Sequence, residues 1–265
     1  MILAEESAIA MPLDIRTIPC LDDNYAYLAH DPATGATALI DIPEAAPILK
    51  ALEDLGWTLS DILITHHHYD HIDGLADVLR QHPARVIGAA ADAHRLPALD
   101  VKVAEGDTVQ VGSQSGTVID VSGHTEGHVA FYFAGSAAVF TADSLMALGC
   151  GRVFEGTKPQ MHESLQKLAA LPGDTVVYSG HEYTAANAKF ALTIDPDNAA
   201  LISRVREVTE KRASHLPTVP SLLSEELATN PFLRAHYPAI QAHLGMTGAN
   251  AVDVFTEIRT RKDNF

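Results

Sequence analysis

The segment "ITHHHYDHIDG", residues 64–74, places four histidines and two aspartates in eleven positions directly behind an apolar run. Solvated loops are built more often from serine, asparagine, glycine or lysine than from so much imidazole. Neutral imidazole and carboxylate groups are ligands that divalent transition metals prefer. The segment therefore predicts a metal site, and hydrolysis by metal-activated water is the chemistry that such a site supports.

The spacing within this segment suits two neighbouring positions. His66 and His68 are two residues apart, so both side chains can face the same side of an extended backbone. Asp70 and His71 come slightly later and can reach a second position. His67 should point away from the metals, and for it we favour a packing role or a hydrogen bond to a ligand. The segment thus offers ligands for two adjacent ions.

Three further candidates stand in equivalent places along the chain. His124 follows "TVIDVSG", Asp143 follows "AVFTA" and His181 follows "TVVYSG", just as His66 follows "DILIT". Each preceding run is apolar and reads as a strand. Strand ends that converge on one edge of a sheet are where α/β folds usually place their chemistry. We therefore expect these residues to join the metal site. For His128, which follows in "GHTEGH", we favour the same supporting role as for His67.

The elements that must position these residues change in character near residue 181. The expected strands are 36–42, 61–65, 85–89, 107–111, 116–121, 129–133, 138–141 and 175–178. The expected helices among them are 44–55, 75–81 and 162–171, the first with Pro47 early and Gly56 as its stop. After residue 181 strand patterns vanish, and segments 183–195, 198–214 and 223–236 read as helices interrupted by prolines. This predicts an α/β sandwich in residues 1–181 and a small helical domain in residues 182–265.

Composition limits the class of protein. The chain has 265 residues, is 47% hydrophobic and carries a formal charge of −16, which argues against a nucleic-acid partner. Its two cysteines, Cys20 and Cys150, are compatible with a reducing cytosol. No apolar stretch approaches the roughly 20 residues that a membrane span needs. The first residues do not read as a secretion signal, so we expect a cytoplasmic protein in which residues 1–10 are an extension or Met11 is the start.

The motifs together resemble a known family. His66-x-His68-x-Asp70-His71, followed by "GHTEGH", "FTADS" and "GHEYT", is similar to the metallo-β-lactamase superfamily. The stretches "LDDNYAYL", "GCGRVFEGT", "YSGHEYTAANAKFAL", "NPFLR" and "RTRKDNF" resemble the hydroxyacylglutathione hydrolases, or glyoxalase II, over nearly the whole chain from Met11. The resemblance implies an αββα sandwich of two mixed sheets flanked by helices, followed by a small all-α C-terminal domain.

The resemblance also implies how the candidate ligands divide. One ion would be held by His66, His68 and His124, a second by Asp70, His71 and His181, and Asp143 would bridge the two. Asp70 and Asp143 would be the catalytic carboxylates, acting with a hydroxide that bridges the metals. We expect zinc in both positions, with iron or manganese as the alternatives, because histidine and aspartate accept all three.

The expected reaction is thioester hydrolysis. Two ions about 3.5 Å apart can hold a shared water and lower its pKa toward ~7, giving a hydroxide that attacks the thioester carbonyl. The family resemblance implies S-D-lactoylglutathione as the substrate and D-lactate and glutathione as products, the second step of methylglyoxal detoxification. The sequence has no Gly-x-Ser-x-Gly motif, and Cys150 lies among glycines with no adjacent base, so no protein nucleophile is expected.

Substrate recognition requires local positive charge, because glutathione carries two carboxylates and the protein is acidic. The resemblance assigns this role to Arg152, Tyr183, Arg259 and Lys262. Phe154 stands where some relatives have tyrosine, so one hydroxyl contact is expected to be missing. For Arg261 we favour a solvated position. We expect a small-molecule glutathione thioester as the partner, no nucleic acid or membrane, and a monomer.

Two alternatives stay open at this point. A glutathione persulfide dioxygenase with a single iron would share the fold, but such enzymes are usually shorter after the last metal histidine. A non-enzymatic module that binds glutathione conjugates would use its metals structurally. Structural zinc sites are usually closed by four protein ligands, whereas three ligands plus a shared aspartate leave a position for water, which favours catalysis.

Overall fold

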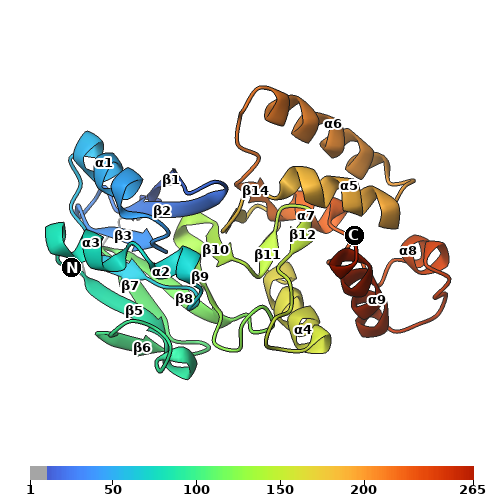
Figure 1. Ribbon diagram of the computed structural model, residues 1–265, viewed down its shortest axis with the longest axis horizontal. Coiled ribbons are helices and arrows are strands. Elements are labelled where there is room, and N and C mark those ends of the chain that lie inside the picture. The colour runs from blue at the N-terminus through green and yellow to red at the C-terminus, as the bar shows by residue number, and fades with distance from the viewer. Residues whose placement is uncertain (1–10) are drawn as a thin grey trace, which may run out of the picture.

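The computed structural model describes residues 11–265, and its centre is a pair of six-stranded sheets (Figure 1). The first sheet contains, in spatial order, β1 (Asp14–Cys20), β2 (Asn24–His30), β3 (Thr37–Ile40), β4 (Asp61–Leu63), β5 (Arg85–Ala89) and β6 (Val101–Val103). The second contains β14 (Ser221–Leu222), β13 (Val176–Ser179), β10 (Ala138–Ala142), β9 (Val129–Phe133), β8 (Gln114–Asp120) and β7 (Thr108–Val111). Both sheets are mixed, with parallel and antiparallel pairs. The predicted extension, residues 1–10, lies outside the described residues.

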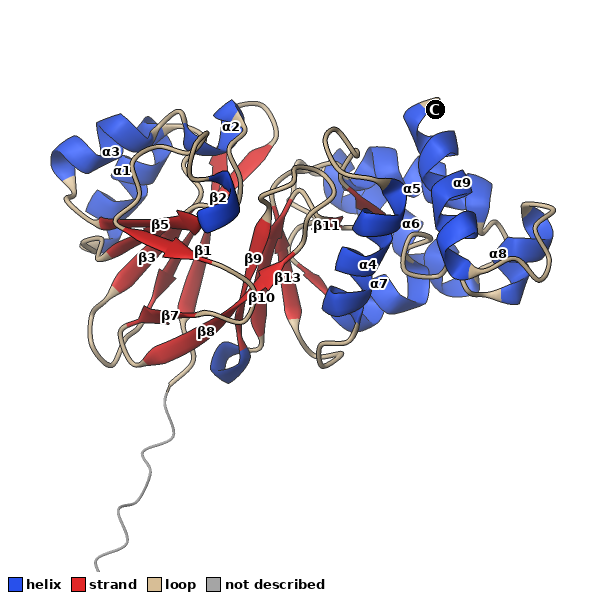
Figure 2. Cartoon of the chain, turned by 90° about the horizontal axis from the view of Figure 1, so that it is seen from below, coloured by secondary structure: helices blue, strands red, loops and turns tan. Residues whose placement is uncertain are grey.

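Helices cover the outer faces of this sandwich (Figure 2). On the side of the first sheet lie α1 (Ala45–Leu55), α2 (Tyr69–Ile72) and α3 (Leu75–Gln81). On the side of the second sheet lie α4 (Lys158–Ala169), α5 (Thr184–Ile194), α6 (Ala199–Ala213), α7 (Leu223–Thr229), α8 (Pro238–His243) and α9 (Ala251–Asp263). A short ribbon of β11 (Leu145–Met146) and β12 (Gly149–Cys150) lies between the second sheet and these helices. The predicted αββα sandwich followed by helices is confirmed.

Side chains along β2 alternate between two buried cores, which explains why the outer face of the first sheet must also be covered by helices. In β2, Tyr25, Tyr27 and Ala29 contribute to the core between the two sheets. Their neighbours Ala26 and Leu28 face the core beneath α1 and α3. Both faces of the strand are apolar, so each must be covered. The core under α4 also includes residues of α5 and α9, so the C-terminal helices complete the outer layer of the second sheet.

The element boundaries confirm most predictions and correct several. β5, β9 and α3 have the predicted bounds, and α1 ends at Gly56, which adopts φ 67°. Helix α4 begins four residues before the predicted 162–171, because Thr157 and Gln160 form a capping box. The predicted absence of strands after residue 181 is wrong, since β14 pairs with β13. A two-residue strand has no periodicity that a sequence pattern could reveal.

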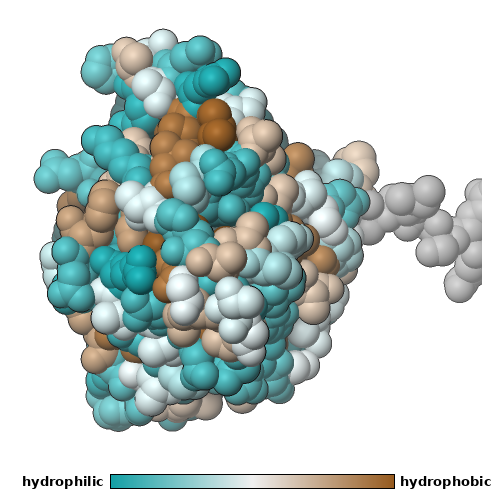
Figure 3. Space-filling view, turned by 90° about the vertical axis from the view of Figure 1, so that its right-hand side faces the viewer, coloured by the Kyte–Doolittle hydropathy of each residue, from teal (hydrophilic) through white to brown (hydrophobic). Residues whose placement is uncertain are grey.

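The predicted helix over 223–236 is also shorter than expected. It ends at Thr229, since Pro231 cannot continue a helix and biases the residue before it toward an extended conformation. No helix in residues 11–265 is long and apolar enough to cross a membrane. On the face shown in Figure 3, hydrophilic residues predominate and apolar residues form small separate patches.

Candidate metal centre

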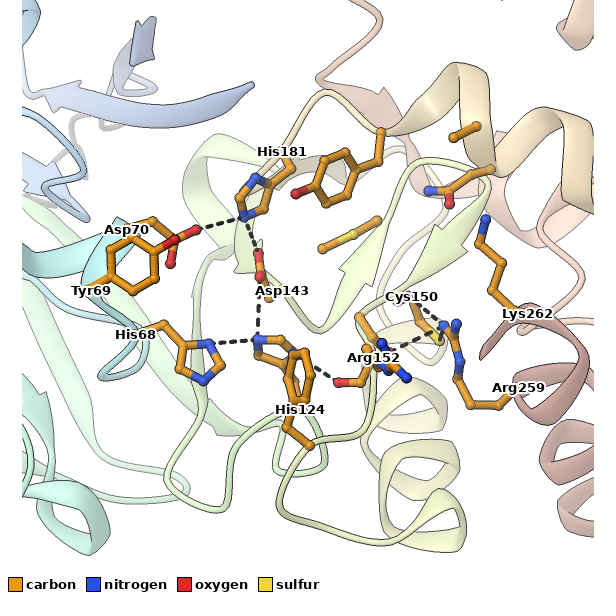
Figure 4. Close-up of a pocket in the computed structure, with 16 residues that line it drawn as sticks. His68, Tyr69, Asp70, His124, Asp143, Cys150, Arg152, His181, Arg259 and Lys262 are labelled. Atoms are coloured by element: carbon orange, nitrogen blue, oxygen red, sulfur yellow. Dashed lines mark hydrogen bonds and ion pairs between the residues drawn. The ribbon is translucent and has the colours of Figure 1, made fainter. Parts of the chain in front are cut away.

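The strand ends of two sheets meet at the candidate site. His66 follows β4 of the first sheet, whereas His124, Asp143 and His181 follow β8, β10 and β13 of the second. The predicted ligands therefore come from the edges of both sheets. Two sheet edges converge, and Figure 4 shows His68, Asp70, His124, Asp143 and His181 turned toward one another.

Local backbone geometry aims Asp143 into this space. The pairing of β10 with β13 shifts register between Phe140 and Ala142, and Ala142 adopts φ 40°. The chain therefore turns sharply just before the aspartate. Gly180 lies against the other side, where a Cβ atom would be 2.5 Å from Asp143 Oδ1 and 2.9 Å from His71 Cε1. Only glycine leaves room for both side chains.

Three ring nitrogens form the first donor set. His66 Nε2 lies 3.2 Å from His68 Nδ1, and His124 Nε2 lies 3.0 Å from the same atom. Burial holds the pKa of His66 well below its ordinary value and lowers that of His68 to about 4. The rings are therefore neutral near pH 7, and neutral imidazole nitrogens are metal ligands.

A second donor set lies beside the first. Asp70 Oδ2 is 3.6 Å from His181 Nε2 and 4.0 Å from His71 Nε2. Asp143 lies between the sets: its Oδ1 is 3.3 Å from His181 Nε2, and its Oδ2 is 3.3 Å from His124 Nε2. The structure thus brings together all seven residues that the sequence predicted as ligands.

Unpaired atoms test whether this arrangement fits a metal. Among the residues that the structure describes, His71 Nε2 and Asp143 Oδ1 are buried and have no hydrogen-bond partner. An unsatisfied buried polar atom costs roughly 1 to 3 kcal/mol. A cation between the donors removes that cost, so the centre fits divalent metal ions.

Asp41 orients one ligand of each set. Its Oδ2 accepts hydrogen bonds from His71 Nδ1 and Thr65 Oγ1, both at 2.8 Å, and its Oδ1 accepts from the Thr65 N–H at 2.8 Å. Since the Thr65 hydroxyl donates to Asp41, its oxygen can accept from His66 Nδ1, 3.0 Å away. Both imidazoles thereby keep Nε2 free for a metal. Asp41 follows the apolar strand β3, so the strand-end pattern could have found it.

Three other groups orient the remaining ligands. The backbone carbonyl of Arg152 accepts a hydrogen bond from His124 Nδ1 at 2.7 Å. Asp23 accepts one from His181 Nδ1 at 2.9 Å, and Asn24 donates to Asp70 Oδ2 at 3.1 Å. Asp23 and Asn24 belong to the junction of β1 and β2, where the sequence carries no signal of their role.

The metal centre opens into a cavity of about 750 Å³ that reaches α5 and α9. The predicted substrate residues Arg152, Phe154, Tyr183, Arg259 and Lys262 all line it. Tyr183 stacks on His181, with ring centroids 4.6 Å apart. In Figure 4, Arg152, Arg259 and Lys262 lie across the cavity from Asp70.

The three cationic side chains differ in their exposure and in the contacts they make. The Arg152 side chain is 60% exposed, and Lys262 is half-buried with its Nζ 5.2 Å from the Phe190 ring. Arg259 is buried: it donates to the Cys150 carbonyl at 3.0 Å and pairs with Asp263. Arg259 therefore holds the cavity wall as well as adding charge. Arg261, as expected, lies outside the cavity and pairs with Glu257.

Comparison with known proteins identifies the family. Residues 30–181 match the metallo-beta-lactamase superfamily, and residues 182–265 match the hydroxyacylglutathione hydrolase C-terminus. A hydroxyacylglutathione hydrolase of Jannaschia sp. is 66% identical over 95% of this chain and 98% of its own length. The chain belongs to the hydroxyacylglutathione hydrolases. The resemblance drawn from the motifs is confirmed, and so is the prediction that the protein is an enzyme.

Other known proteins also match this hydrolase over most of its length. The hydroxyacylglutathione hydrolase of Roseobacter denitrificans is 65% identical to this hydrolase over 96% of the chain and the whole of its own length. Among solved structures, ETHE1 from Myxococcus xanthus is 26% identical, covering 93% of this chain and 90% of its own, with a TM-score of 0.67. The match therefore extends over sandwich and C-terminal helices alike.

Two histidines next to the ligands have other surroundings. In this hydrolase His67 points away from the donors and bonds Asp92 Oδ2 through Nδ1 at 2.7 Å. His128 is buried and stacks on His66, with centroids 4.6 Å apart and planes 11° apart. Within residues 11–265 neither of its ring nitrogens has a hydrogen-bond partner. Its contact with the metal centre is therefore through the face of the ring.

Proposed function

We propose that this hydrolase cleaves S-2-hydroxyacylglutathione thioesters, S-D-lactoylglutathione first among them, to a 2-hydroxy acid and glutathione. The observation that carries the proposal is one cavity with a His/Asp centre at one end and cations at the other. The reacting carbonyl belongs at the centre, and the glutathione carboxylates belong near Arg152, Arg259 and Lys262. The two carboxylates of the substrate need local positive charge in a protein whose formal charge is −16.

We further propose that two zinc ions bind, one at each donor set. The first set would be His66, His68 and His124, the second Asp70, His71 and His181, with Asp143 shared. The unpaired buried atoms of His71 and Asp143 support a cation on that side of the centre. When bound, divalent ions supply Lewis acidity and lower the pKa of bound water, which is what thioester hydrolysis at neutral pH requires.

The side chains of the cavity leave water as the nucleophile. Burial raises the pKa of the Cys150 thiol to about 11 although Arg259 is close, so little thiolate forms near pH 7. Asp70, held by Asn24, and Asp143 turn their carboxylates into the centre, where they can orient a water molecule at the thioester carbonyl. The leaving thiolate has an ordinary pKa near 8.5, so it departs with little need of an acid.

We propose a division of labour between residues 1–181, which carry the catalytic centre, and residues 182–265, which complete the binding cavity. Support comes from Tyr183, Arg259 and Lys262, which reach the cavity from the C-terminal helices. The two family matches also meet between residues 181 and 182. A monomer, a cytoplasmic location and the choice of zinc over iron or manganese stay predictions.

The alternatives are not favoured. A dioxygenase with a single iron would leave the second donor set without a use. A binding module would not require a coordination position that is left open for water. The test is to incubate purified protein with S-D-lactoylglutathione and follow loss of the thioester. Glutathione persulfide with an oxygen electrode is the control reaction. Elemental analysis should give about two metal ions, and chelation should abolish turnover. Oxygen uptake without thioester loss would refute the proposal.

A further inference from the structure

Four ionisable side chains beside the metal centre form a closed ring. His67 bonds Asp92 at 2.7 Å, Asp92 pairs with Arg95, Arg95 forms two hydrogen bonds to Glu155, and Glu155 Oε1 returns to His67 Nε2 at 3.5 Å. We call these residues, His67, Asp92, Arg95 and Glu155, the ionic ring. None of them lines the cavity or belongs to the donor sets.

The ionic ring fixes the loop of residues 151–157, which carries two cavity side chains. Arg152 and Phe154 lie on this loop, and Glu155 follows directly. On one side the loop is held by hydrogen bonds to residues 123 and 124. The Phe154 N–H donates to the His124 carbonyl at 3.3 Å, the Gly156 N–H donates to the Gly123 carbonyl at 3.2 Å, and the Arg152 carbonyl accepts from His124 Nδ1 at 2.7 Å. On the other side Glu155 accepts from the Glu126 N–H at 2.9 Å and from both terminal nitrogens of Arg95.

The geometry of the ring is more restrictive than that of a surface ion pair. Asp92 is fully buried, and the Arg95 and Glu155 side chains are only 31% and 26% exposed. Gly127 lies against Asp92, where a Cβ would be 2.3 Å from the aspartate Cβ. A bidentate arginine–carboxylate pair fixes orientation as well as distance. The ring therefore ties the loop to a buried anchor on η1 (Ala90–Asp92).

We propose that Arg95 and Glu155 are positioning residues for substrate binding: by fixing loop 151–157, the ionic ring sets Arg152 and Phe154 at the cavity wall. This inference rests on the proposed function, in which Arg152 lies near the glutathione carboxylates, and Phe154 lines the same cavity. The Phe154 and His124 ring centroids lie 5.3 Å apart, and Arg152 Cζ lies 5.7 Å from the centroid of the Phe154 ring. A shift of the loop therefore displaces Arg152 and Phe154 together.

The test compares Arg95→Ala and Glu155→Gln with Arg80→Ala as a matched control. Arg80 forms an exposed pair with Asp77 on α3, away from the cavity. Glu155→Gln keeps the shape of the side chain and an acceptor oxygen for the Glu126 N–H, so it is the variant that folds if Arg95→Ala does not. We expect both ring variants to raise KM for S-D-lactoylglutathione about 5- to 50-fold while kcat and metal content stay near wild type.

A double-mutant cycle separates positioning from general stability. In an Arg152→Ala/Phe154→Ala background, Arg95→Ala should raise KM less than twofold further, because the groups it positions are gone. Wild-type KM in both ring variants, with only a lowered melting temperature, would overturn the inference. So would a full additional KM increase in the double-alanine background. If the wild type itself fails to hydrolyse the thioester, it is the proposed function that fails.

Discussion

Asp41→Asn is the substitution that most directly tests how the metal centre is oriented. Asp41 has φ 56°, in the left-handed region that asparagine also tolerates, so the backbone should not change. The wild-type carboxylate accepts from Thr65 N–H, Thr65 Oγ1 and His71 Nδ1, each at 2.8 Å. An amide offers only one acceptor oxygen. In one orientation its NH₂ group meets the Thr65 N–H, and in the other it meets His71.

The expected size follows from those contacts. A hydrogen bond to a charged acceptor contributes about 1.5 to 3 kcal/mol, and asparagine loses at least one of the three. We expect the free energy of unfolding without metal to fall by about 2 to 4 kcal/mol. If the amide donates to His71 Nδ1, the ring proton moves to Nε2, which faces the centre. Loss of such an orienting group typically lowers metal affinity 10- to 100-fold.

The assay needs a control that separates metal binding from stability. Asp31 is a second fully buried aspartate, which accepts from the N–H groups of Ala33 and Ser113 at 2.9 and 2.6 Å, at the opposite end of β2 from Asn24. Asp31→Asn should also lower stability but leave metal affinity unchanged. Metal affinity is measured by competition with a chelator, and stability by denaturant unfolding of the metal-free protein. Equal metal affinity in Asp41→Asn and wild type would refute the reasoning.

Three further predictions concern the centre and the cavity. Asp143→Asn should lower kcat at least 100-fold with little change in KM, since both carboxylate oxygens face donor sets; steady-state kinetics with elemental analysis checks this. Lys262→Ala should raise KM about 3- to 30-fold with kcat unchanged, because it removes a half-buried cation that binds the ground state and the transition state equally from the far end of the cavity. An unchanged KM would contradict this prediction. Gly180→Ala should lower metal content and kcat together, because its Cβ would lie 2.5 Å from Asp143 Oδ1; a fully loaded, active variant would show that the loop adapts.

Much of the candidate site could be predicted because chemistry follows strands in this chain. His66, His124, Asp143 and His181 each come directly after an apolar run, and a run of that kind is visible without knowing its partners. The same rule would have found Asp41, which follows β3. The rule could not say that His66 and His124 come from different sheets, because the pairing of strands is a non-local property.

Elements that are buried on both faces, or whose position depends on packing against distant segments, were harder to predict. β2 shows no alternation of polar and apolar residues, because one face packs on the second sheet and the other on α1. Helix α9 has a mixed pattern, in which Val254, Phe255 and Ile258 are buried beside the charged Arg259. Its position depends on packing against α4, which the local sequence does not encode.

The sequence by itself determined which residues can hold metal and which cations are available, because side-chain chemistry and spacing along a strand are local. Only the tertiary structure decided what each of them contacts. It showed Arg259 committed to the Cys150 carbonyl, Lys262 left with aromatic neighbours, and His67 placed in the ionic ring. These outcomes depend on which distant segments fold against one another, and hydrogen bonds between residues far apart in sequence leave no periodic pattern along the chain.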